Sequence, residues 1–119
     1  MRNILSILVV LAFFVTPVTA LAGEGPMELP KGANPEAVSH NKEGIASWNK
    51  KDYKGALMHF SAASKIDGSS GEIHFNEAIS YDKLGQHGTA TTHFGVAKKK
   101  AGGNKKILES PILNGHLGK

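Results

Sequence analysis

Hydrophobic and polar positions follow a helical period over most of the chain after residue 34. The four helices that this pattern predicts span about 35–49, 53–66, 71–84 and 87–100. The first begins at Asn34-Pro35, a capping residue followed by a proline in the first turn. In the second, Ala56, Phe60 and Ala63 have the i, i+4, i+7 spacing of a buried stripe. The pattern therefore predicts an all-α protein.

The helical pattern occurs twice, with a shift of 34 residues. The identical pairs are His40/His74, Glu43/Glu77, Ile45/Ile79, Ala56/Ala90, His59/His93, Phe60/Phe94, Ala63/Ala97, Lys65/Lys99 and Gly68/Gly102. These nine identities exceed the roughly two expected by chance, so we infer two copies of one helical hairpin.

These residues resemble the tetratricopeptide repeat family, whose period is also 34 residues. Ala56-x3-Phe60 and Ala90-x3-Phe94 match its pattern of an alanine followed four residues later by an aromatic residue. Several positions depart from the pattern: His40 and His74 replace Trp, Glu43 and Glu77 replace Leu, Ser47 replaces an aromatic residue, and Gly68 and Gly102 replace the closing Pro. The resemblance implies a right-handed solenoid of two hairpins, at about 37–70 and 71–104.

The segments outside the repeats have different patterns. Residues 105–119 begin like a third unit, with a short helix from Asn104 through Leu108 that is interrupted at Pro111, and we expect them to cap the second repeat. Residues 23–34 contain two prolines and no periodicity, which predicts a flexible leader before the two-repeat domain at 35–104.

Residues 1–22 have the pattern of a cleavable signal peptide. Arg2 provides a positive start, residues 4–15 are almost entirely apolar, and Ala20-Leu21-Ala22 is the small-x-small motif of a cleavage site. Cleavage after Ala22 is expected, with cleavage after Ala20 as the alternative. A membrane anchor would need about 20 apolar residues, which is longer than this run. The pattern predicts export to the periplasm or the extracellular space, without a membrane span after signal removal.

Composition limits the chemistry that the chain can perform. The 119 residues have a net charge of +4 and include no cysteine, which excludes disulfides, thiolate metal sites and covalent haem attachment. Neither a nucleophile-elbow motif nor a phosphate-binding glycine loop occurs. We therefore expect a protein that is not an enzyme and that has no cofactor.

The resemblance implies a partner-binding surface, because the first helix of each hairpin lines the concave groove in this family. The residues at the corresponding positions are Asn41, Ile45, Trp48, Asn49, Phe75, Asn76, Ile79 and Lys83. Asparagine amides could hold the backbone of an extended peptide while the apolar residues bury its side chains. The alternative is that these residues form the core of a two-repeat domain too small to spare them.

Two repeated histidine motifs are candidates for metal chemistry. His40-x2-Glu43 and His74-x2-Glu77 each place two ligand types on one helix face, and together they could offer two imidazoles and two carboxylates to one ion. Adjacent helices lie roughly 10 Å apart, which is too far for one ion without further movement. The favoured interpretation is therefore that no metal is bound and that these histidines pack between helices. His59 and His93 are expected at the edge of the buried stripe.

A basic cluster follows the second repeat. It contains Lys98, Lys99, Lys100, Lys105 and Lys106. The cluster is either a solvated helix C-terminus, where cations favour the helix dipole, or a surface for an anionic partner. Export and the absence of arginine after Arg2 argue against nucleic acid.

Together these features predict an exported adaptor that binds another protein or peptide through the concave face of its first helices. One alternative is a structural protein that self-associates by stacking of solenoid ends. The other is a carrier of a metal or small ligand that uses the repeated His-Glu pairs.

Overall fold

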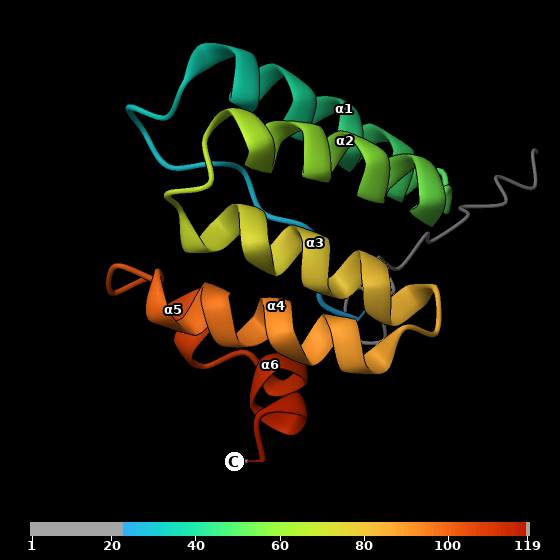
Figure 1. The fold of residues 1–119 in the computed structure, drawn as a ribbon, viewed down its shortest axis with the longest axis vertical. Coiled ribbons are helices and arrows are strands. Elements are labelled where there is room, and N and C mark those ends of the chain that lie inside the picture. The colour runs from blue at the N-terminus through green and yellow to red at the C-terminus, as the bar shows by residue number, and fades with distance from the viewer. Residues whose placement is uncertain (1–22, 119) are drawn as a thin grey trace, which may run out of the picture.

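The computed structural model describes residues 23–118, which form helices and connecting segments without a β-strand. The helices are α1 (Pro35–Asn49), α2 (Tyr53–Ile66), α3 (Gly71–Lys83), α4 (His87–Lys99), α5 (Lys105–Leu108) and α6 (Pro111–His116). In Figure 1, α1 lies beside α2 and α3 lies beside α4, so consecutive helices form two hairpins. The all-α prediction is confirmed for this part of the chain. The predicted signal peptide at 1–22 lies outside the described residues.

Short polar side chains begin the helices at the predicted positions. The side chains of Asn34, Asp52 and Ser70 each accept a hydrogen bond from a backbone N–H group in the first turn of α1, α2 and α3. The turn from α1 to α2 contains Lys51 with φ +62°, and the turn from α3 to α4 contains Gly85 with φ +79°. The helix boundaries are therefore set by local sequence, which is why the pattern of the chain predicts them closely.

Small residues allow close contact between the helices of each hairpin. In the first hairpin, a Cβ atom added at Gly44 would lie 2.5 Å from the Phe60 ring, so this aromatic side chain packs directly on the backbone of α1. The equivalent residues of the second hairpin, Ala78 and Phe94, are fully buried. Ala56, which belongs to the predicted buried stripe, and its repeat equivalent Ala90 are also fully buried.

The core consists of two hydrophobic clusters, one in each half of the domain. The first contains Ala37, Ala56, Phe60, Ala63 and Ile73. The second contains Phe75, Ala78, Ile79, Ala90, Phe94, Ala97, Ala101, Ile107 and Leu113. Trp48 packs against both clusters and so joins the two hairpins.

The segment before α1 differs from the flexible leader that was predicted. Residues 23–34 pass behind α3 and reach the start of α1 (Figure 1), and the side chains of Met27 and Leu29 pack against the second and first hydrophobic clusters respectively. The backbone of Met27 is hydrogen-bonded to side chains of α1 and α3. The leader is thus docked on the helices, because alternate apolar side chains and a hydrogen-bonded backbone hold it there.

The C-terminal cap contains one helix more than predicted. The expected helix after Asn104 is α5, but Pro111 begins α6 instead of ending the helical structure. Proline is tolerated at the first helical position, and the Ser110 hydroxyl caps this helix by accepting a hydrogen bond from the Leu113 N–H group. Ile107 and Leu113 then cover the second hydrophobic cluster, as expected for the end of a stack of helices.

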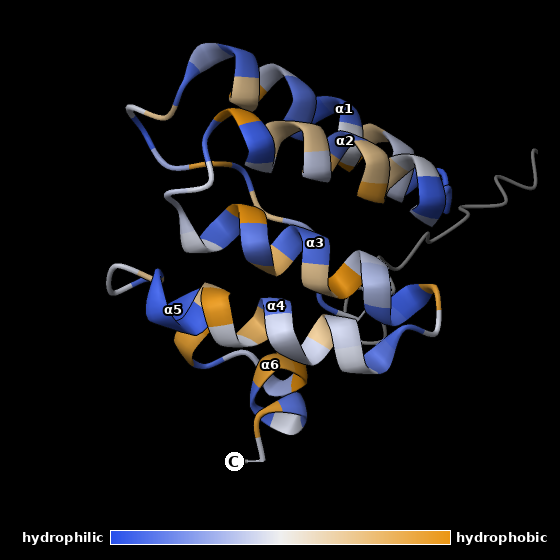
Figure 2. Cartoon of the chain, in the orientation of Figure 1, coloured by the Kyte–Doolittle hydropathy of each residue, from blue (hydrophilic) through white to orange (hydrophobic). Residues whose placement is uncertain are grey.

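Hydropathy is distributed unevenly among the helices. Figure 2 shows α1 as largely hydrophilic, whereas the start of α6 is hydrophobic where it packs on the core. Within residues 23–118, none of the helices combines the length and the apolar character needed to cross a membrane.

Candidate functional site

The candidate site is the face of α1 and α3 that is covered by residues 23–34, which we call the leader-binding face. At its centre, the Asn76 side chain accepts a hydrogen bond from the Met27 N–H group (2.7 Å) and donates one to the Met27 carbonyl (2.7 Å). The Asn41 Nδ2 atom donates a second hydrogen bond to the same carbonyl (3.0 Å). Both polar groups of one leader residue are therefore bound by side chains of the two repeats.

The two asparagines also hold each other in place. Asn76 Nδ2 donates to Asn41 Oδ1 over 2.7 Å, and both side chains are almost completely buried. Ser80 lies one turn after Asn76 on α3, and its hydroxyl donates a hydrogen bond to the Asn76 backbone carbonyl. Because a buried amide without partners would be costly, this pair is fixed in the orientation that presents one acceptor and two donors to the leader.

The remaining predicted groove residues divide into three groups. Ile45 and Trp48 are partly buried at the leader-binding face, where Gly25 of the leader approaches the Trp48 indole nitrogen. Asn49 and Lys83 are exposed at the ends of α1 and α3. Phe75 and Ile79 belong to the second hydrophobic cluster, and Phe75 packs edge-on to Phe94 with ring centroids 5.6 Å apart. For Phe75 and Ile79 the structure therefore agrees with the alternative interpretation, since both are core residues and do not line a groove.

One edge of the leader-binding face is aromatic and cationic. Trp48 makes an edge-on contact with Tyr53, with ring centroids 4.8 Å apart. The Lys83 ammonium lies 5.5 Å from the Tyr53 ring centroid and 6.0 Å from that of Trp48, within the range of cation–π attraction. Lys83 of the second hairpin therefore contacts two aromatic rings of the first hairpin. This cation–π contact links the hairpins, and the repeat pattern alone does not indicate it.

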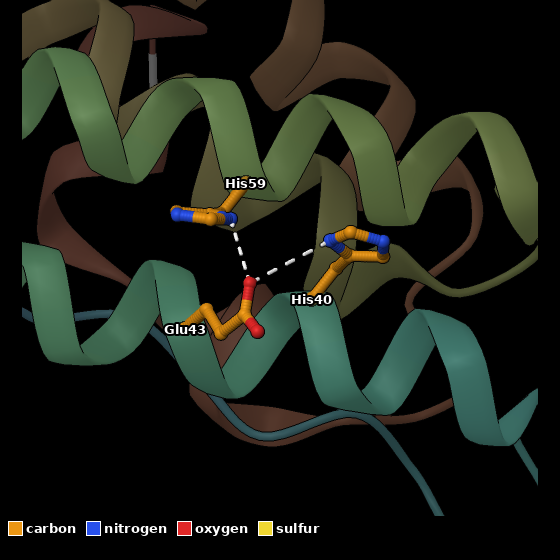
Figure 3. A group of neighbouring side chains, drawn as sticks. All are labelled: His40, Glu43 and His59. Carbon is orange, nitrogen blue, oxygen red and sulfur yellow. Dashed lines mark ion pairs between the residues drawn. The ribbon is translucent and has the colours of Figure 1, made fainter.

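Histidines and carboxylates form a second set of candidate groups. In the first hairpin, the Glu43 Oε2 atom lies 3.0 Å from His59 Nδ1 and 3.8 Å from His40 Nδ1 (Figure 3). The ring centroids of His40 and His59 are 6.2 Å apart. The spacing within α1 predicts only that His40 and Glu43 lie together; His59 of α2 is the third member of the group.

The second hairpin repeats this arrangement in a more buried setting. Glu77 Oε1 lies 3.5 Å from His74 Nδ1 and 4.0 Å from His93 Nδ1, and the two imidazole centroids are again 6.2 Å apart. The ligand atoms of each group lie within 4.8 Å of one another. The two His-Glu pairs do not combine into one cluster, as the separation of adjacent helices had already argued; each pair instead associates with a further histidine of its own hairpin.

A third group joins α3, α4 and α6. Asp82 Oδ1 lies 2.7 Å from His87 Nδ1 and 2.8 Å from His116 Nε2, and the Thr91 hydroxyl lies 2.8 Å from His116 Nδ1. Sequence reasoning missed this group, since it has no repeat equivalent and its members are up to 34 residues apart. Its short hydrogen bonds fasten the C-terminal helix to the second hairpin.

The electrostatic surroundings of His74 differ from those of an exposed histidine. The neighbouring Glu77 carboxylate raises the pKa of the His74 imidazole above its ordinary value, whereas burial opposes this effect. The Gly68 carbonyl, which accepts a hydrogen bond from His74 Nε2 over 2.9 Å, raises this pKa further, and Lys100 lowers it. The second hairpin therefore favours a positive charge between His74 and Glu77.

The predicted basic cluster is only partly a free surface. Lys99, Lys100, Lys105 and Lys106 are exposed, whereas Lys98 is partly buried. Lys100 donates a hydrogen bond from its ammonium group to the Gly68 carbonyl. Lys105 and Lys106 line a cleft that also contains Glu24, Glu28 and Glu109. Lys105 and Lys106 thus share this cleft with three carboxylates, and the cluster does not form a uniformly positive face.

Comparison with known proteins gives no relative for this chain: no family model, no curated protein and no solved structure matches it.

Proposed function

We propose that the protein is an exported adaptor of the tetratricopeptide type, in which α1 and α3 line the concave face of a two-repeat, right-handed solenoid and bind an extended segment of another protein. Export is supported by the signal-like pattern of residues 1–22. The 34-residue repeat and the pairing of α1 with α2 and of α3 with α4 support the solenoid.

The binding function rests on one observation, the hydrogen bonding of Met27. Asn76 bonds to both its N–H and its carbonyl group, and Asn41 bonds to the same carbonyl. Recognition through the backbone is a common way to bind an extended peptide, because it does not depend on the sequence of that peptide. The leader-binding face thus has the chemistry that an extended partner requires, and residues 23–34 occupy it within the chain.

The side chains of the leader indicate which partner sequence would fit. Met27 packs against the second hydrophobic cluster and Leu29 against the first, so residues two apart face the helices while Glu28 between them is exposed. A partner segment with two apolar residues separated by one polar residue would make the same contacts. The expected partner is therefore an extended apolar-x-apolar segment.

The attached leader competes with any such partner. A segment joined to its binding site by a short linker has an effective concentration in the millimolar range, so a free peptide of equal affinity is largely excluded. Weakening the leader should therefore strengthen the binding of an added peptide. This relation distinguishes an exchangeable face from a permanent core.

The test uses a fluorescently labelled peptide with the sequence of residues 23–34 and measures its anisotropy with the whole protein. Met27→Ala in the protein weakens the competing leader, and we expect it to increase peptide affinity about tenfold, since partial burial of such a side chain contributes about 1–2 kcal/mol. Lys31→Ala is the matched control because the Lys31 side chain is an exposed part of the leader, and it should leave the affinity unchanged. Equal peptide binding by the Met27→Ala protein and the control variant would contradict the proposal.

A further inference from the structure

The histidine group of the second hairpin contains an unusual concentration of buried polar atoms without hydrogen-bond partners. We call His74, Glu77 and His93 the His74 group. His74 Nδ1, His93 Nδ1 and Glu77 Oε1 are all buried and make no hydrogen bond, and the Glu77 side chain is only 7% exposed. Buried polar atoms are normally hydrogen-bonded, so three such atoms facing one another need an explanation.

Hydrogen bonding around His74 determines which of its nitrogens carries the proton. Its Nε2 atom lies 2.9 Å from the Gly68 carbonyl, which can only accept, so Nε2 is the protonated nitrogen. In the neutral ring, Nδ1 then presents a lone pair toward Glu77 Oε1, which is also an acceptor, at 3.5 Å. A positive charge between these acceptors would satisfy all of them at once.

The arrangement fits a divalent transition metal ion. Tetrahedral ligands with bonds of about 2.0–2.1 Å lie roughly 3.3 Å apart. The measured separations of Glu77 Oε1 are 3.5 Å to His74 Nδ1 and 4.0 Å to His93 Nδ1, so small side-chain rotations would close the set around an ion. Two imidazoles and one carboxylate leave a fourth position for water or another ligand, as in many zinc sites.

The surroundings of the His74 group would support bound metal. The Gly68 carbonyl orients the His74 ring through the nitrogen that faces away from the group, which is the usual second contact of a metal-binding histidine. The Ser61 hydroxyl of α2 donates to the other Glu77 oxygen, Oε2, over 3.4 Å. Tyr81 stacks on the His93 ring with centroids 5.1 Å apart. The ligands thus come from two helices, α3 and α4, and the Ser61 contact from α2 further limits the movement of Glu77.

The other two histidine groups provide internal comparisons. The repeat-related group has the same ligand types, but Glu43 is 55% exposed and already pairs with His59 at 3.0 Å, so binding there should be weaker. At the third group, Asp82 Oδ1 accepts from two histidines at 2.7 and 2.8 Å. These atoms already have partners, and an ion would have to replace existing hydrogen bonds.

We propose that His74, Glu77 and His93 bind a divalent transition metal ion with the ligand preference of Zn²⁺, and that His40, Glu43 and His59 form a weaker copy of the same site. This binding is independent of the leader-binding face, because the two use different side chains. It gives the repeated histidines and glutamates a role that packing does not require.

The test is calorimetric titration of the whole protein, without a polyhistidine tag, with Zn²⁺, supported by the visible spectrum with Co²⁺. Glu77→Gln preserves the shape of the side chain and should weaken Zn²⁺ binding roughly tenfold or more, and His93→Gln should do the same. Glu43→Gln is the matched control in the first repeat and should leave the tightest site unchanged. Absence of Zn²⁺ binding, or equal weakening by Glu43→Gln and Glu77→Gln, would overturn the proposal.

A second measurement covers the case in which a variant does not fold. In the unmodified protein, one equivalent of Zn²⁺ should shift the imidazole NMR signals of His74 and His93 and leave those of His87 in place. Signals that move first at His87 and His116 would assign the metal to the third group and contradict the site proposed here.

Discussion

Replacing Asn76 with alanine is the most informative perturbation of the leader-binding face. The side chain makes three hydrogen bonds, two to the backbone of Met27 and one to Asn41, each with a donor–acceptor distance of 2.7 Å. Each such bond contributes about 1 kcal/mol net to the free energy of unfolding, so Asn76→Ala should lower it by about 3 kcal/mol. For a domain of this size that is a large part of the total of about 5–15 kcal/mol.

The neighbouring asparagines give a graded series for the same measurement. The Asn41 side chain makes two hydrogen bonds: it donates one to the Met27 carbonyl and accepts one from Asn76. Asn41→Ala removes both and should lower the free energy of unfolding by about 2 kcal/mol. Asn49 is exposed on the same helix and should be replaceable by alanine with a change within about 0.5 kcal/mol.

Urea denaturation followed by circular dichroism measures all three variants. The expected order of destabilisation is Asn76→Ala, then Asn41→Ala, then Asn49→Ala. If Asn76→Ala were no more destabilising than Asn49→Ala, the hydrogen bonds between the helices and the leader would contribute nothing to stability. Such a result would refute the role of these hydrogen bonds in holding the leader on α1 and α3.

Three further predictions concern the helix contacts and His74. Gly44→Ala should lower the free energy of unfolding by about 1–3 kcal/mol in a urea titration, because the added Cβ would lie 2.5 Å from the Phe60 ring; an unchanged midpoint would contradict this packing. Gly95→Ala, where the added Cβ meets nothing within 4 Å, should raise it by about 1 kcal/mol through helix propensity, and a loss of stability would show hidden crowding. In metal-free buffer, NMR titration should give a His74 pKa above its ordinary value, and Glu77→Gln should lower it. The raised pKa means that the protonated His74 ring stabilises the folded state. This stabilisation is complete below the pKa of His74 in the unfolded chain, and it is lost as the pH rises through the pKa in the folded state. If the difference in stability between wild type and Glu77→Gln grew with pH in that range, the predicted direction of the effect would be contradicted.

The helices were predictable because their signals are local. A helix cap such as Asn34, and a buried pair such as Ala56 and Phe60, involve residues only a few positions apart in the sequence. The 34-residue repeat then predicts the same helices a second time in the second hairpin. The buried alanines were predictable for the same reason. The departure at Pro111 shows the limit of this approach, since the same residue can end one helix or begin the next.

The candidate site was predictable only in part, because its contacts are long-range. Met27 and Asn76 are 49 residues apart, and a segment without periodicity gives no signal that it will dock. An apolar-x-apolar pair between Pro26 and Pro30 was the one available indication of an extended segment. The third ligand of each repeated histidine group depends on how the paired helices pack, which spacing within one helix does not determine.

The central claim is that the leader-binding face exchanges one extended segment for another. Labelling of the methionine amides with ¹⁵N tests it directly, because Met27 lies in the leader while Met58 is an exposed residue of α2 and serves as an internal reference. Unlabelled peptide with the sequence of residues 23–34 is added to the whole protein. The account predicts that the Met27 signal moves to the position of a free leader as the peptide binds, while the Met58 signal stays in place. A Met27 signal that remains unchanged at saturating peptide would contradict the claim.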